Sequence, residues 1–146
     1  AYPEMHPQAA NPTVDFDNFC RKVKAGANSA ITQLFYNADA YFCFVERCVK
    51  AGITIPIVPG IMPITGYANI VRFCNGCGAD LPRWIRLRLE ELEDDKPALQ
   101  HFGAEVVTRL CETLLRGGAP GLHFYTINQA APTMRLWKSL SLPVPA

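Results

Sequence analysis

Gln33 stands in the most apolar run of the chain, ITQLFY, where a buried β-strand would ordinarily carry another Val or Ile. A glutamine amide offers both hydrogen-bond donors and an acceptor. At the end of a strand it could bind a ligand whose edge mixes donors and acceptors. The alternative is a core glutamine satisfied by neighbouring backbone, and the residues alone favour this alternative.

The three histidines differ in their surroundings. His101 follows Gln100 on a predicted helix face and is expected to be solvated, whereas His123 lies in an apolar segment and is expected to be a hydrogen-bonded core histidine. His6 lies in a Pro-rich loop close to Tyr2. Because loop residues on a rigid scaffold often carry function, His6 is the histidine that qualifies as a candidate site residue.

The acidic and thiol groups predict no catalytic or metal centre in this segment. The run EELEDD (90–95) is interpreted as a solvated helix end, and no carboxylate pair stands at strand ends to act as a general acid and base. Cys74 and Cys77 form a lone CxxC, whereas a structural zinc site needs four ligands. We interpret the two thiols as half-buried structural groups.

Composition excludes several classes of protein. The 146 residues are 49% hydrophobic with a formal charge of +1, which argues against a nucleic-acid-binding protein. No apolar stretch approaches the roughly 20 residues of a membrane span, and the N-terminal residues do not have the pattern of a secretory signal, so we expect none. Six cysteines scattered through helical segments favour a reducing, cytoplasmic environment over a disulfide framework.

The elements that must position these residues alternate along the chain. Glycine stops and apolar spacing predict strands over 30–36, 53–61 and 121–128, the first two buried on both faces. The same signals predict helices over 14–25, 37–51, 65–77, 81–92, 97–116 and 131–140. This alternation indicates a parallel α/β fold, and no Gly-rich phosphate loop supports a Rossmann order. A (β/α)8 barrel typically needs about 250 residues, so the chain has room for about half of one.

Four stretches in order resemble the methylenetetrahydrofolate reductase family. They are AYPEMHP, FCRKVKAGANSAITQLFYN, PIVPGIMPIT and HFYTIN, and the resemblance extends from Tyr2 to about Leu140. It implies a (β/α)8 TIM-barrel fold in which residues 1–146 form a single domain, from the end of strand 5 to helix 8. The front half of the barrel would be missing. The family's acidic residue for proton transfer belongs to that half and would be missing too.

The same resemblance implies a flavoprotein oxidoreductase. Bound FAD would be reduced by NADH or NADPH and would reduce 5,10-methylenetetrahydrofolate to 5-methyltetrahydrofolate, a step of one-carbon metabolism and methionine biosynthesis. We expect the chain to work as part of a longer enzyme, with the missing N-terminal half or as a homo-oligomer. The competing hypothesis is a non-catalytic, truncated half-barrel that binds no flavin and serves as an interaction module.

Individual site residues follow from matching motif positions. Tyr2, His6, Asp15 and Lys22 match positions that bind FAD in the family. Gln33, Phe73, Tyr125 and Ile127 match positions that bind the folate, and Phe73 would also pack against the nicotinamide cofactor. Gln129 stands where many bacterial members have Arg, so an ionic contact to the folate tail would be lost there, and Asn69 replaces a common Gln.

Overall fold

Three parallel strands and six helices make up the part of the chain that the computed structural model describes, residues 1–142. The sheet has the order β1 (Ala30–Leu34), β2 (Ile57–Ile61), β3 (His123–Phe124), and both neighbouring pairs are parallel. The helices are α1 (Pro12–Lys24), α2 (Ala38–Lys50), α3 (Tyr67–Cys77), α4 (Arg83–Glu91), α5 (Lys96–Arg116) and α6 (Ala130–Ser139). The predicted parallel α/β class is confirmed.

Each predicted helix is present, with small shifts at the ends. The first helix starts earlier than expected because Pro12 occupies its first turn, where a missing N–H costs nothing. Asn11 caps it, since its side-chain oxygen accepts from the backbone N–H groups of Thr13 and Val14. The acidic run 90–95 is solvated as predicted, and Asp95 caps α5 by accepting from Ala98 N–H.

The strands are shorter than predicted. The expected third strand over 121–128 is reduced to His123–Phe124, followed by one more backbone bond from Tyr125 N–H to the carbonyl of Ile61. Because β2 ends at Ile61, nothing pairs with the chain beyond, which turns with positive φ at Ile127 and Asn128. The prediction that β1 is buried on both faces is also wrong, since Ile31 is 44% exposed.

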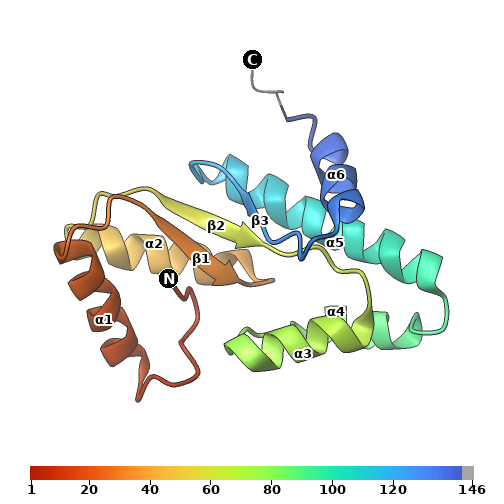
Figure 1. The fold of residues 1–146 in the computed structure, drawn as a ribbon, viewed down its shortest axis with the longest axis horizontal. Coiled ribbons are helices and arrows are strands. Elements are labelled where there is room, and N and C mark those ends of the chain that lie inside the picture. The colour runs from red at the N-terminus through yellow and green to blue at the C-terminus, as the bar shows by residue number, and fades with distance from the viewer. Residues whose placement is uncertain (143–146) are drawn as a thin grey trace.

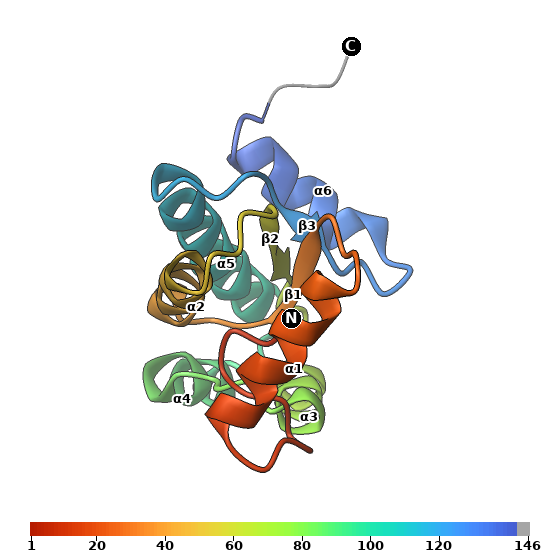
Figure 2. The ribbon, with the colours of Figure 1, turned by 90° about the vertical axis from the view of Figure 1, so that its left-hand side faces the viewer.

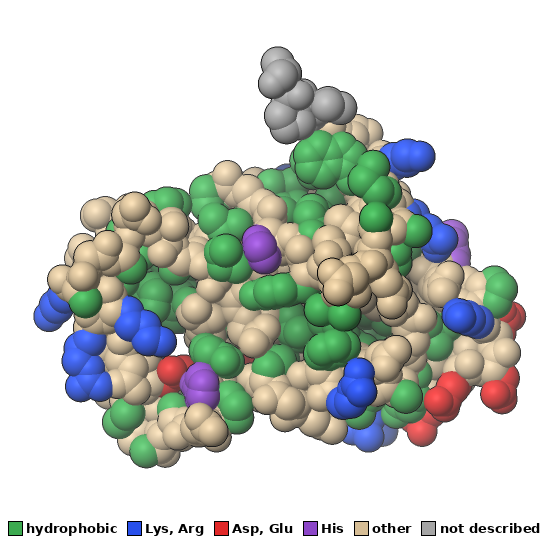
Figure 3. All heavy atoms as spheres, viewed as in Figure 1, with side chains coloured by type: hydrophobic (Ala, Val, Ile, Leu, Met, Phe, Trp, Pro, Cys, Tyr) green, Lys and Arg blue, Asp and Glu red, His purple; other side chains and the backbone are tan. Residues whose placement is uncertain are grey.

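The helices leave one face of the sheet uncovered. In Figures 1 and 2, α2 and α5 lie together on one side of the strands, while among the described residues no helix covers the opposite face of β1. Figure 3 shows that apolar side chains gather over the middle of that face, with basic side chains at the α1 end. A sheet that is half covered explains why β1 combines buried and exposed side chains.

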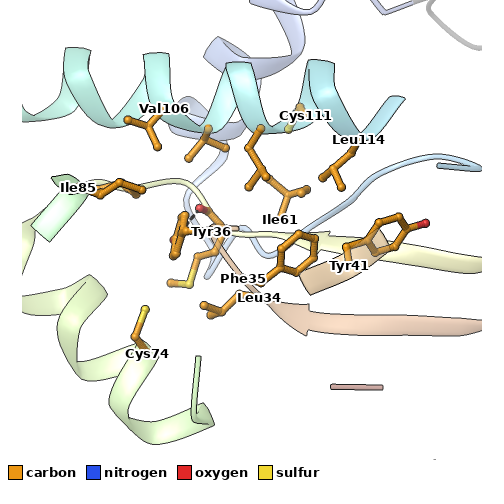
Figure 4. Packing of buried hydrophobic residues seen from close by; sticks show 14 of the residues in the cluster. Leu34, Phe35, Tyr36, Tyr41, Ile61, Cys74, Ile85, Val106, Cys111 and Leu114 are labelled. Atoms are coloured by element: carbon orange, nitrogen blue, oxygen red, sulfur yellow. Dashed lines mark hydrogen bonds between the residues drawn. The ribbon is translucent and has the colours of Figure 1, made fainter. Parts of the chain in front are cut away.

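The core lies between the sheet and α5, and extends to α3 and α4. Ile61 of β2 and Phe35, which directly follows β1, point toward Leu114 of α5, and Cys74 of α3 points toward Leu34 (Figure 4). The buried hydroxyl of Tyr36 donates to the carbonyl of Met62 at 3.0 Å. No helix within residues 1–142 is long and apolar enough to cross a membrane.

Candidate functional site

The four residues predicted to bind the cofactor line a single hollow. Tyr2, His6, Asp15 and Lys22 surround a cavity of about 320 Å³ between the N-terminal loop, α1 and the start of β1. Its volume falls at the lower end of the range of small-molecule sites. Aromatic rings, a carboxylate and a lysine are thus brought to one place from two different segments.

The N-terminal loop is held in place by defined contacts. Ala1 donates to the carbonyl of Ile31 at 2.8 Å and accepts from Gln33 N–H at 2.7 Å, which is the hydrogen-bond pattern of a parallel strand pair. His6 N–H donates to the Asp15 carboxylate at 2.9 Å. The rings of Tyr2 and His6 meet edge to face with centroids 4.5 Å apart. Asp15 therefore orients the loop as well as facing the hollow.

Three of the four predicted folate residues line a second pocket. Phe73 of α3, Tyr125 and Ile127 surround a cavity of about 160 Å³ beyond the carboxyl ends of β2 and β3. Asn69 and Gln129, at which the sequence departs from the family pattern, lie in the same lining. In open parallel sheets, ligands bind at the carboxyl ends of the strands, so the position of this pocket suits a substrate.

Gln33 is half-buried beside a bulge in β1 and does not line either pocket. Ile31 pairs with Val58 but Leu34 with Gly60, so β1 has one residue more than β2 over this stretch. Such bulges redirect side chains. The Gln33 side-chain oxygen accepts from Leu34 N–H at 3.0 Å. Within residues 1–142 its NH2 group donates no hydrogen bond.

The bulge is stabilised by two side-chain hydroxyls, one from Thr32 of β1 and one from Tyr125, which follows β3. The hydroxyl of buried Thr32 accepts from Gly60 N–H at 2.8 Å, and the hydroxyl of Tyr125 donates to the carbonyl of Thr32 at 2.8 Å. A Cβ on Gly60 would lie 2.2 Å from that carbonyl oxygen and 2.6 Å from the Tyr125 ring. Tyr125 thus uses its hydroxyl to fix the sheet while its ring faces the second pocket.

Burial favours the neutral forms of Tyr125, which lines the second pocket, and of Cys74 beside Phe73. Burial raises the pKa of Tyr125 and raises the pKa of Cys74 to about 12. Cys77 is half-buried as the sequence interpretation proposed, whereas Cys74 is more enclosed than proposed and is buried. Residues 1–142 contain no group of three or more His, Cys, Asp or Glu side chains that could hold a metal ion.

Two of the other predictions need adjustment. His123 is half-buried, and its ring meets Tyr125 edge to face with centroids 5.0 Å apart, so it is less enclosed than predicted. Ile127 is 52% exposed because it lies in the turn that replaces the expected strand. His101 is exposed, as predicted.

Sequence reasoning missed Arg72, which lines the second pocket beside Phe73. Its guanidinium lies 5.4 Å from the centre of the Phe73 ring. The signal was present in the pair Arg72-Phe73, because a cation next to an aromatic on one helix can serve the same ligand. Arg72 gives the pocket a positive charge, whereas Gln129 in the same lining is neutral.

The fold and the pockets define a parallel α/β protein with one cavity of about 320 Å³ and a second of about 160 Å³, both lined in part by its loops. The family model for methylenetetrahydrofolate reductase matches residues 1–141, and the chain belongs to this family. It is 37% identical over 142 residues to the 5,10-methylenetetrahydrofolate reductases of Salmonella typhimurium and Escherichia coli. The chain, matched over 97% of its own length, spans 48% of each of these relatives.

Two further comparisons agree. A probable methylenetetrahydrofolate reductase (NADPH) of Caenorhabditis elegans is 42% identical over 142 residues, which are 97% of this chain and 21% of that protein. A solved structure from Clostridium thermocellum, described as an uncharacterized protein that binds two copies of 5-methyl-5,6,7,8-tetrahydrofolic acid, superposes with a TM-score of 0.60 at 19% identity. It covers 97% of this chain and 51% of that one, and this likeness concerns the fold alone.

Proposed function

We propose that this chain is the second half of a methylenetetrahydrofolate reductase barrel and contributes the binding surfaces for FAD, nicotinamide cofactor and folate. The observation that carries the proposal is the grouping of the predicted residues. Those assigned to the cofactor share one hollow, and three of those assigned to the folate share the other. These residues come from separate motifs, and a shared ligand explains why each set lines the same cavity.

In this proposal residues 1–146 form a single domain, a partial (β/α)8 barrel with strand 5 ending at Ala1. The parallel pairing of Ala1 with β1 supports this, because it extends the sheet on the side away from β2. The uncovered face of the sheet would be the barrel interior, completed by an N-terminal half or by association of chains into a homo-oligomer. The complete enzyme is proposed to be cytoplasmic.

The cofactor hollow has groups that fit FAD. Tyr2 and His6 can pack against the adenine end, and Lys22 supplies a point charge for the diphosphate. Asp15 holds the backbone of His6 and so fixes the loop that carries both rings. When bound, the flavin would carry reducing equivalents from NADH or NADPH to the folate.

The second pocket is proposed to hold the folate. Phe73 offers an aromatic face against which the folate and the nicotinamide can pack in turn, and the Tyr125 ring and Ile127 add apolar walls. Arg72 can pair with the carboxylates of the folate tail. Gln33 lies outside this pocket, so its NH2 group in the β1 bulge would donate to a part of the pterin that extends beyond the pocket.

No residue of this chain is proposed as the catalytic acid. No carboxylate of the described residues faces the second pocket, since none belongs to its lining. The acidic group for proton transfer is therefore proposed to belong to the other half of the enzyme. This chain orients the reactants, and the other half supplies the proton.

The proposal is tested by the colour and FAD affinity of the complete protein that contains this chain. We expect it to be purified with the yellow absorption of oxidised flavin. Lys22→Ala should raise the dissociation constant of FAD about 5-fold, the effect of losing one exposed ion pair. Lys24→Ala is the matched control, because Lys24 lies in the same helix end but outside the hollow.

A colourless protein that stays free of flavin after addition of FAD would refute the proposal. That result would support the competing hypothesis of a non-catalytic half-barrel that serves as an interaction module. If both lysine variants lost FAD affinity equally, the assignment of Lys22 to the diphosphate would be refuted, but the proposed function would not.

A further inference from the structure

The loop that carries Tyr2 and His6 is fixed to the end of helix α3. The side chain of Glu4 reaches the turn after α3, and its Oε2 accepts from the backbone N–H of Asp80 at 2.9 Å. This contact joins residues 76 positions apart in the sequence. Within residues 1–142, no Lys or Arg forms an ion pair with Glu4, so the backbone N–H is its polar partner.

A second contact lies beside the first. Gly78 ends α3 with φ of +69°, a conformation that L side chains rarely adopt. A Cβ at Gly78 would lie 3.1 Å from the carbonyl oxygen of Met5 and 3.3 Å from the ring of Pro7. The N-terminal loop therefore rests directly on the last turn of α3.

Helix α3 also carries residues of the second pocket. Phe73 and Arg72 lie one to two turns before Gly78 on the same helix. The loop, in contrast, presents Tyr2 and His6 to the first hollow. A rigid helix transmits a displacement of its end along its axis, so a shift of the loop at Glu4 reaches the second pocket.

We propose that Glu4 is a positioning residue that couples the two pockets by fixing the cofactor loop to the end of α3. Its carboxylate acts through the backbone N–H of Asp80, although Glu4 also belongs to the lining of the first hollow. The proposal rests on the proposed function for the identity of the two ligands, but the mechanical link itself concerns only this chain's own residues.

The burial of Glu4 agrees with a structural role. Burial raises the pKa of its carboxyl group, while the hydrogen bond from Asp80 acts in the opposite direction. A carboxylate that is held in a partly buried place against this desolvation has a use there. Here the carboxylate accepts the hydrogen bond from Asp80 N–H and so fixes the loop to the end of α3.

The test compares three variants in the complete protein. Glu4→Met keeps the length of the side chain and removes both oxygens, and Glu4→Gln restores one acceptor. Glu46→Ala is the control, because Glu46 is an exposed carboxylate on α2 that pairs with Lys50. Glu4→Ala serves as a second truncation if the methionine variant does not fold.

The first readout is hydrogen exchange in the protein without flavin. Glu4→Met should speed exchange in residues 1–8 and in residues 74–82, while Glu4→Gln and Glu46→Ala should resemble the wild type. Unchanged exchange in residues 74–82 would overturn the proposal. This readout needs neither cofactor nor activity, so it separates failure of the link from failure of the proposed function.

The second readout is the KM for methylenetetrahydrofolate at saturating FAD. Glu4→Met should raise this KM about 10-fold, equivalent to about 1.4 kcal/mol, with a smaller change in kcat. Glu4→Gln should recover most of the loss. A variant that binds FAD more weakly but keeps the wild-type KM would show that Glu4 serves the loop alone, which would overturn the coupling.

Discussion

The Gln33 amide is satisfied on one side only. Its oxygen accepts from Leu34 N–H, and its NH2 group is free within the described residues. Because the Leu34 N–H holds the amide oxygen, the NH2 donor is oriented before any ligand arrives. This arrangement suits recognition of a ring edge that presents acceptors.

Gln33→Glu is expected to separate the two half-reactions of the proposed enzyme. Reduction of the flavin by the nicotinamide cofactor should change little, because the contact to the folate is not in use. Oxidation by the folate should slow about 10- to 100-fold, since the lost donor costs about 1–3 kcal/mol. Stopped-flow absorbance of the flavin measures both rates.

Gln100→Glu is the matched control, because Gln100 is half-buried on α5 outside both pockets. It should leave both half-reactions unchanged. If Gln33→Glu also leaves both unchanged, Gln33 is a packing residue, and the interpretation that the residues alone favoured is correct.

Glu4 is expected to make stability depend on pH in a defined direction. Its pKa is raised in the folded protein, so the folded state binds its proton more tightly than the unfolded state. Its contribution to stability is therefore fully present below the ordinary carboxyl pKa and is lost as the pH rises through the folded-state pKa.

Glu4→Gln removes this titration. The stability of the variant relative to the wild type should therefore increase from about pH 4 to pH 7, starting at the ordinary carboxyl pKa. Urea unfolding at both pH values measures the difference. A relative stability that falls over this range would contradict the assignment, and Glu46→Gln, at an exposed site, serves as the comparison.

At the scale of elements, the β1 bulge decides how the sheet presents its side chains. Thr32 is fully buried, and its hydroxyl takes the place of a backbone acceptor for Gly60 N–H. Thr32→Val keeps the volume of the side chain and leaves that N–H without a partner. It should lower the free energy of unfolding by about 1–3 kcal/mol, measured by urea denaturation.

Thr113→Val provides the control. The Thr113 hydroxyl donates to the carbonyl of Arg109 on the exposed side of α5, so its loss can be replaced by water. We expect a change within about 0.5 kcal/mol. If both variants lost the same free energy of unfolding, the hydrogen bond at the bulge would contribute no more to stability than an exposed one.

The order and type of the elements could be predicted from the sequence because their signals are local. Glycines after α1, α2 and α5 and the apolar spacing of Phe16 and Phe19 act within a few residues. The bulge, the short third strand and the Glu4–Asp80 contact depend on partners 28 to 93 positions away. No pattern within a window of the sequence reports such partners.

The site residues show the same division. Their grouping into two pockets followed from motif positions, because each motif carries its own strand end or loop. Arg72 was missed because it belongs to none of the four motifs. Tyr125 was assigned to the folate, and nothing in the sequence indicated that its hydroxyl binds Thr32. Residue type alone does not show whether a side chain such as Tyr125 contacts a ligand, stabilises the fold or does both.

At the scale of the whole molecule, the uncovered face of the sheet is an apolar surface. Ile31 of β1 is 44% exposed there. The isolated 146-residue chain should therefore bind a hydrophobic dye such as ANS or self-associate, whereas the complete protein should do neither. Ile31→Lys should reduce dye binding by the isolated chain.

Val49→Lys is the control for that experiment. Val49 is 66% exposed but lies on α2, on the covered side of the sheet. Dye fluorescence and light scattering at equal protein concentration measure both variants. Equal effects of the two lysines would show that general surface hydrophobicity, and not this face, drives association.

The hydrogen bond from Tyr125 to Thr32 also sets an order of events in time. Its two residues are 93 positions apart, so the ribosome must add the intervening chain before the bond can form. At about 5–20 residues per second, this takes roughly 5 to 20 seconds. Throughout that interval β1 and β2 can pair while the bulge lacks its final donor, so the nascent chain is most open to mispairing before Tyr125 emerges.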